Sequence, residues 1–95
     1  MEPGIYLDSS ASTRVHPAVL EAMLPHFSGS FGNPSSLHAL GRAARQAVED
    51  ARACIAGTIS ARDAEIVFTS GGTESNNLTL KGVAFANRSR GRHLI

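Results

Sequence analysis

The segment from Glu65 to Asn77 constrains the fold more than any other part of the chain. Its first five residues, Glu65-Ile66-Val67-Phe68-Thr69, form a β-branched and aromatic run that is typical of a buried strand. Two glycines, Gly71 and Gly72, follow almost at once, and residues 73 to about 87 can form a helix that ends near Gly91. A strand joined to a helix through a glycine turn predicts an α/β fold whose parallel sheet is covered by helices.

Two further helices are predicted upstream. Pro17 suits a first helical turn, and apolar residues then recur at helical spacing until Pro25 interferes, which predicts a short helix over 17–24. The clearest amphipathic pattern begins at Leu37, with Ser36 as a plausible N-cap and Gly57 as a plausible stop. A glycine inside that helix, Gly41, would cost about 1 kcal/mol relative to alanine.

The remaining segments predict short strands and a loop. Ile5–Asp8 suits a brief strand or extended arm, and His93–Ile95 resembles the opening of another strand. Residues 28–36 are rich in turn-forming residues and should be a loop. We therefore expect an arm, short helix and loop over 1–35, and the start of a larger α/β domain over 36–95. Because a parallel sheet needs more strands than these, we expect a truncated sheet and a fragment of a longer chain.

Composition excludes several classes of protein. The chain is 42% hydrophobic and 18% charged with a net charge of +1, which is ordinary for a globular domain and gives no sign of nucleic-acid binding. No apolar run approaches the ~20 residues needed to span a membrane, and no signal peptide is apparent, so we expect a cytoplasmic protein. The single cysteine, Cys54, allows no internal disulfide or zinc spacing, and we expect it to serve in packing.

The glycine turn is a candidate anion site. Backbone amides of Gly72, Thr73 and Glu74 would point from the start of the helix, and the Thr73 hydroxyl could add a donor. A purely structural interpretation also holds, in which Gly71-Gly72 makes a tight turn and Thr73 caps the helix. The segment lacks the pattern of dinucleotide sites and the lysine of nucleotide-triphosphatase loops. Glu74 favours the helix dipole but would repel a phosphate unless its side chain turns away.

Three blocks of sequence stand out together. They read YLDSSAST at residues 6–13, FGNPSSLH at 31–38 and EIVFTSGGTESNN at 65–77. In order and spacing they resemble the first three signature blocks of the cysteine desulfurases, which are class V, fold-type I enzymes dependent on pyridoxal 5'-phosphate. The resemblance covers essentially the whole chain, so it implies the start of a fold-type I α/β domain.

The resemblance implies roles for five residues. Gly72 and Thr73 match the pair that holds the cofactor phosphate, through a backbone amide and a hydroxyl. Asn33 and His38 match a loop near the active site or the dimer contact, and Ala11 matches the arm that lines the substrate pocket. From the residues alone, Asn33 is equally a turn residue before proline, and His38 a polar residue in a first helical turn.

Some positions depart from the family pattern. Ser9 and Ser12 replace residues that are more often aromatic or amide and threonine, respectively. His16 stands before Pro17, where an acidic N-cap is usual, and a neutral histidine should cap poorly. These departures concern the arm and the first helix and leave the glycine turn intact.

The resemblance also implies a reaction and partners. Cysteine desulfurases remove sulfur from L-cysteine, giving alanine and an enzyme persulfide, and supply it to an acceptor or scaffold protein for iron–sulfur cluster or thio-cofactor assembly, usually as homodimers. The stacking histidine, the aspartate, the Schiff-base lysine and the nucleophilic cysteine of the family have no matching positions here. We expect Lys81, the sole lysine, to point away from the site, so these residues alone should be inactive.

Two alternatives stay open from the sequence. Class V relatives that act as selenocysteine lyases or aminotransferases share enough early sequence to fit. A small non-catalytic module that binds a phosphorylated ligand or a partner protein at the glycine turn also fits. The module would have to fold alone, whereas we expect a truncated sheet to leave an apolar edge and a loose or aggregating state.

Overall fold

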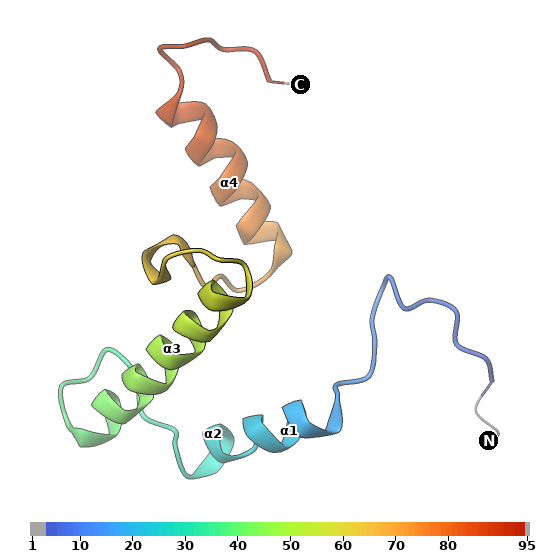
Figure 1. The fold of residues 1–95 in the computed structure, drawn as a ribbon, viewed down its shortest axis with the longest axis vertical. Coiled ribbons are helices and arrows are strands. Elements are labelled where there is room, and N and C mark those ends of the chain that lie inside the picture. Colours follow the sequence, from blue (N-terminus) through green and yellow to red (C-terminus); the bar gives the residue numbers. More distant parts are fainter. Residues whose placement is uncertain (1–3, 95) are drawn as a thin grey trace. The chain divides into compact units, whose positions relative to one another are not determined.

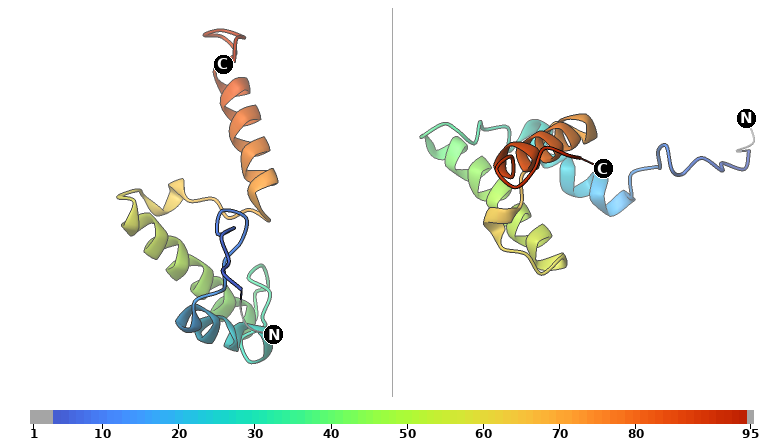
Figure 2. Two further views of the ribbon diagram at one scale, coloured as in Figure 1. Left: turned by 90° about the vertical axis from the view of Figure 1, so that its right-hand side faces the viewer. Right: turned by 90° about the horizontal axis from the view of Figure 1, so that it is seen from above.

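A computed structural model describes residues 4–94, and all regular structure in this range is helical (Figure 1). The elements are α1 (Pro17–Met23), α2 (Pro25–Ser28), α3 (Ala39–Thr58), the 3₁₀ turn η1 (Asp63–Glu65) and α4 (Gly72–Ala86). The long helices α3 and α4 run without interruption in every view (Figure 2). The chain divides into one compact unit that ends at Ala51 and another that begins at Arg52, and each is described by itself.

The predicted strands do not form within residues 4–94. Glu65 belongs to η1, and residues 66–69 lack regular structure, although the backbone of Ile66 is extended at φ −95° and ψ 125°. Residues 5–8 are also irregular, as are His93 and Leu94, while Ile95 lies outside the described residues. A strand is defined by hydrogen bonds to a neighbour, and no other described segment pairs with residues 66–69. The expected truncated sheet is therefore not found in this part of the chain.

The helix predicted from Pro17 is confirmed as α1. Pro25 ends it as expected but also opens α2, because proline is well accepted at a first helical position. We expected His16 to cap poorly, yet it is the N-cap: its Nδ1 accepts a 3.3 Å hydrogen bond from the Ala18 amide. Its carbonyl also accepts the amides of Val19 and Leu20 at 2.9 and 3.0 Å.

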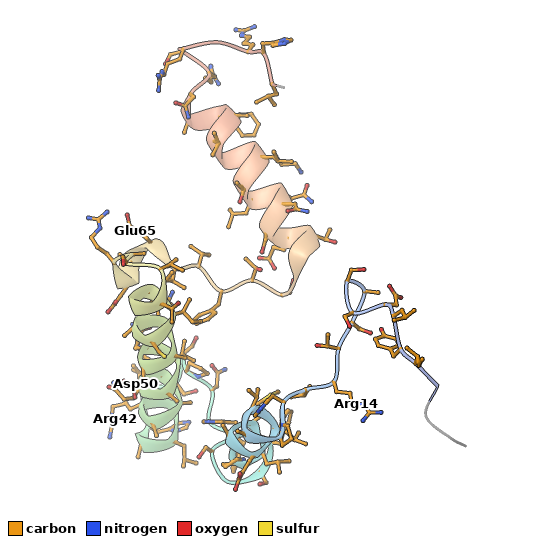
Figure 3. All side chains as sticks on the ribbon, turned by 45° about the vertical axis from the view of Figure 1, so that its right-hand side comes forward. Arg14, Arg42, Asp50 and Glu65 are labelled. Carbon is orange, nitrogen blue, oxygen red and sulfur yellow. The ribbon has the colours of Figure 1, made fainter. Side chains whose placement is uncertain are left out.

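The long helix α3 is confirmed, but its N-cap differs from the prediction. His38 occupies that place, because its Nδ1 accepts the Gly41 amide at 3.3 Å and its carbonyl accepts the Arg42 amide at 3.0 Å. The Arg42 guanidinium donates back to the Leu37 carbonyl at 2.6 Å (Figure 3). Ser36, the predicted cap, lies instead against the first turn of the helix.

Two glycines let the preceding loop approach the start of α3. A Cβ atom on Gly41 would overlap the backbone carbonyl group of Ser36, and one on Gly32 would overlap the carbonyl group of Leu40. Gly41 is accordingly buried. The glycine that the sequence presents only as a cost to the helix is required by this contact.

The other end of α3 also differs from the prediction. The helix passes through Gly57 and ends at Thr58. The left-handed position that follows belongs to Ser60, with φ 55°. The Ala61 amide donates to the Ala56 carbonyl at 2.9 Å, and the Ser60 amide reaches the Gly57 carbonyl at 3.5 Å, which is the Schellman pattern. Gly57 is therefore not the stop.

Side chains tie the segment after α3 to the helix. The Arg52 guanidinium donates to the Ile66 carbonyl and lies over the Phe68 ring at 5.0 Å from its centroid. In η1 the Glu65 carboxylate accepts the Arg62 amide at 2.7 Å and the Arg62 guanidinium at 3.1 Å (Figure 3). These bonds to Arg62 lower the pKa of Glu65 below 4.5.

Few side chains are buried in the described range. Ala56, at 1% exposure, is the only buried hydrophobic residue there, whereas Leu37 is 90% and Phe85 71% exposed. Cys54 is exposed among the described residues, and the packing role expected for it stays a prediction. Among residues 4–94, no helix combines the length and apolar character that a membrane crossing requires.

Replacing Gly41 with alanine should destabilise the protein, although alanine normally favours a helix. The new methyl group meets the Ser36 backbone, and overpacking of this kind costs about 1–3 kcal/mol. The matched change Gly82→Ala in α4 meets nothing within 4 Å and should stabilise by about 0.5–1 kcal/mol. Denaturant unfolding followed by circular dichroism measures the free energy of unfolding of both variants. An equal rise in this free energy for Gly41→Ala and Gly82→Ala would contradict the contact with Ser36.

Replacing Ser60 with glycine should stabilise the end of α3 by about 1 kcal/mol, because glycine has no Cβ to clash in the left-handed region. Ser60→Ala keeps the Cβ and should change the free energy of unfolding by less than about 0.5 kcal/mol. Thermal unfolding of the two variants checks the difference. A gain for the alanine variant equal to that of the glycine variant would show that the backbone conformation is not the cause.

Candidate functional site

The glycine turn lies between the extended segment and α4. Gly71 is the N-cap, its backbone is fully extended at φ 164° and ψ −177°, and no side chain caps the helix. The Gly71 carbonyl accepts the first backbone bond, from the Ser75 amide, at 3.1 Å. Thr73 is thus the second helical residue and does not cap α4, so one part of the purely structural interpretation is wrong.

Two side-chain bridges, one nested inside the other, enclose the turn. In the inner bridge, the Ser70 amide and hydroxyl both donate to Oε2 of Glu74, at 2.8 and 2.6 Å. In the outer bridge, the hydroxyls of Thr69 and Ser75 lie 2.6 Å apart, and the Thr69 hydroxyl also donates to the Gly71 carbonyl at 3.2 Å. In the sequence, residues 71–73 lie between the two bonded residues of each bridge. We call residues 69–75 with these bonds the bridged turn.

Backbone donors collect inside the bridged turn. The amides of Gly72, Thr73 and Glu74, which the sequence predicts as donors, meet no acceptor among the described residues, and neither does the amide of Gly71, as expected for the first turn of a helix. A Cβ on Gly71 or Gly72 would meet nothing within 4 Å, so the space beside them is open. Amide donors, a nearby hydroxyl and the positive end of the helix dipole form a donor set that suits an anion with several oxygens, such as a phosphate.

The position of Glu74 answers a question left open by the sequence. Its carboxylate binds Ser70, which precedes the N-cap, and does not accept the amides of residues 71–73. The Ser70 hydroxyl, and then the Ser70 amide, lower the pKa of Glu74 below 4.5. The negatively charged Glu74 carboxylate is therefore held by Ser70 in the inner bridge.

The other residues singled out by the resemblance lie in the unit that ends at Ala51. The Ala11 amide donates to the Asp8 carbonyl at 3.0 Å. Asn33 accepts the Ser35 amide on its Oδ1 at 2.9 Å, which is the turn role considered for it. His38 caps α3. Gly72 and Thr73 therefore lie in the bridged turn, whereas Ala11, Asn33 and His38 lie in the other compact unit.

Two groups of structural residues were not predicted from the sequence. The Tyr6 hydroxyl lies 2.8 Å from the Asp8 carbonyl and 2.9 Å from the Ser12 carbonyl, which closes the turn that carries Ala11. The bridged turn was recognised only for its glycines. A serine four residues before a glutamate resembles the capping box with one extra residue, and this spacing was the available signal for the inner bridge.

Comparisons with known proteins place the chain in a family. The model of the aminotransferase class-V family matches residues 5–95. The chain belongs to the aminotransferase class-V family. That family has the α/β architecture of fold type I, which the described residues do not themselves display. No solved structure matches the chain.

The chain is also similar to curated proteins named as cysteine desulfurases. It is 56% identical over 91 residues to "Putative cysteine desulfurase IscS 1" of Bacillus subtilis, covering 96% of this chain and 24% of that protein. It is 53% identical over 95 residues to "Cysteine desulfurase IscS" of Dictyoglomus turgidum, covering 100% and 24%. The protein of that name from Methanosarcina thermophila is 50% identical over 91 residues, covering 96% and 22%. The chain thus spans about a quarter of the length of these relatives.

The inner bridge should be visible in the titration of Glu74. In Ser70→Ala the hydroxyl donor is lost but the amide remains, so the pKa of Glu74 should rise toward its ordinary value. Because the folded-state pKa is lowered, the stabilisation that the bridge provides is present above the unfolded pKa and is lost as pH falls through the lowered value. Carboxyl chemical shifts recorded by NMR against pH measure this, and an identical titration in both proteins would contradict the bridge.

Proposed function

We propose that this chain is the amino-terminal part of a pyridoxal 5'-phosphate-dependent cysteine desulfurase. One observation carries the proposal: the family match extends over residues 5–95, and its similar relatives bear that name at 50–56% identity. The complete protein would remove sulfur from L-cysteine, leaving alanine and a persulfide on the enzyme. It would deliver the sulfur to an acceptor or scaffold protein for iron–sulfur cluster or thio-cofactor assembly.

Gly72 and Thr73 would hold the phosphate of the cofactor. The fit rests on the donor set: unpartnered backbone amides at the start of α4, a hydroxyl on Thr73 and open space beside both glycines. When bound, the cofactor supplies an electron sink for chemistry at the substrate carbon. The residues of this chain would contribute binding and orientation. Lys81, in α4, is not assigned to the cofactor.

Further parts of the proposal concern the complete protein. Ala11, Asn33 and His38 would lie near the substrate pocket or the dimer contact, and residues 36–95 would begin the large α/β domain, with its sheet completed by the rest of the chain. A cytoplasmic homodimer fits this proposal. A selenocysteine lyase or an aminotransferase of class V is the nearest alternative, and activity of the complete protein with L-cysteine separates them.

An independent binding module has less support. Folding alone requires burial of apolar side chains, and Ala56 is the only hydrophobic residue buried among residues 4–94. Large apolar side chains on several elements are exposed instead, including Leu37, Val67 and Phe85. This exposure suits a segment whose partners lie in the rest of a larger protein.

Replacing Thr73 with valine in the complete protein should weaken binding of pyridoxal 5'-phosphate about tenfold, because one hydrogen bond to a charged group is lost. Thr79→Val, further along α4, is the matched control and should leave the dissociation constant unchanged. Equilibrium titration of the cofactor-free apoprotein, followed by cofactor absorbance, measures both dissociation constants. Equal binding by wild type and Thr73→Val would contradict the assignment of Thr73.

A further inference from the structure

We propose that Glu74 is a positioning residue for the phosphate of the bound cofactor. By holding Ser70 through the inner bridge, it fixes the three amides of residues 71–73 and keeps its own charge away from them. This inference rests on the proposed function, because it assumes that the phosphate binds at these amides.

Glu74 binds a different partner from the glutamate of a capping box. As the third residue of α4 it could reach back to the N-cap amide of Gly71, as glutamates in capping boxes do. It accepts instead from the residue before the N-cap: the Ser70 amide and hydroxyl both donate to Oε2. The amide of Gly71 therefore stays available, together with those of Gly72 and Thr73.

Hydrogen bonds to the Gly71 carbonyl hold the turn in shape. The Gly71 carbonyl accepts from the Ser75 amide and from the Thr69 hydroxyl, and that hydroxyl is also bonded to Ser75 in the outer bridge. Thr69 and Ser75 are partly buried, while Ser70 and Glu74 are exposed. Two glycines alone would leave the turn flexible, so ordering by the two bridges removes part of the entropy cost of binding.

The charge of Glu74 also bears on phosphate binding. A carboxylate at the start of a helix is attracted to the same amides that a phosphate needs, and a like charge beside a phosphate opposes binding. Two donors from Ser70 hold the Glu74 carboxylate outside the amides of residues 71–73. The bridge therefore favours a phosphate monoester at a site where an unrestrained glutamate would compete.

The test compares two cofactor forms in the complete protein. Dissociation constants are measured for pyridoxal 5'-phosphate and for pyridoxal, which lacks the phosphate. The variants are Glu74→Ala, which removes the bridge, Glu74→Gln, whose amide oxygen can accept the same two hydrogen bonds, and Ser70→Ala, which removes one donor. The matched control is Glu65→Ala, which removes a carboxylate bound to the Arg62 backbone amide in η1.

We expect Glu74→Ala to raise the dissociation constant for pyridoxal 5'-phosphate about three- to tenfold, with that for pyridoxal unchanged. Glu74→Gln should recover most of the affinity, Ser70→Ala should weaken phosphate-dependent binding by a smaller factor, and Glu65→Ala should bind as wild type does. If Glu74→Ala does not fold, the affinity of Ser70→Ala for pyridoxal 5'-phosphate tests the role of the inner bridge.

Two results would overturn the inference while leaving the proposed function intact. One is wild-type affinity in both Glu74→Ala and Ser70→Ala, and the other is an equal loss of affinity for both cofactor forms. A wild-type protein that binds pyridoxal as tightly as pyridoxal 5'-phosphate would instead contradict the phosphate site itself. The three patterns of dissociation constants are distinguishable in one set of titrations.

Discussion

Hydrogen bonds between residues a few positions apart hold this stretch of chain together. His16 and His38 cap helices, Ala61 and Ala56 close the end of α3, and Ser70 and Glu74 close the turn before α4. Hydrophobic burial, the usual stabilising term in a domain, contributes little within residues 4–94 because Ala56 is the only apolar side chain buried there. The helices are therefore defined by local signals.

The helices were predictable because their signals are local. Pro17, the periodic apolar residues of α3 and the glycines before α4 act within a few positions of the elements they specify. The strands were not, since the extended backbone at Ile66 becomes a strand only when another strand lies beside it. The predicted ends of α3 were wrong. His38 and not Ser36 is the N-cap, and Ser60 and not Gly57 takes the left-handed position after the helix. Residue preferences alone do not say which backbone groups a folded turn leaves unpaired.

The candidate site was predictable in its backbone and not in its side chains. The position of Gly71, Gly72 and Thr73 at the start of α4 could be predicted, because a β-branched run precedes them and a helical pattern follows them. The bridges from Thr69 to Ser75 and from Ser70 to Glu74 depend on rotamers that only the folded turn defines. From the sequence, the charge of Glu74 is an obstacle to an anion site, whereas in the structure Ser70 binds this carboxylate.

The close approach of Gly32 to Leu40 and of Ser36 to Gly41 has a mechanical consequence. Backbone in contact with backbone cannot slide or tilt independently, so the loop that carries Asn33 travels with α3 as a single rigid piece. Because the amides of Gly29 and Ser30 donate to the Pro25 carbonyl of α2, any hinge between α2 and α3 has to lie between Ser30 and Gly32. A loop anchored in this way transmits a rotation of the helix directly to Asn33.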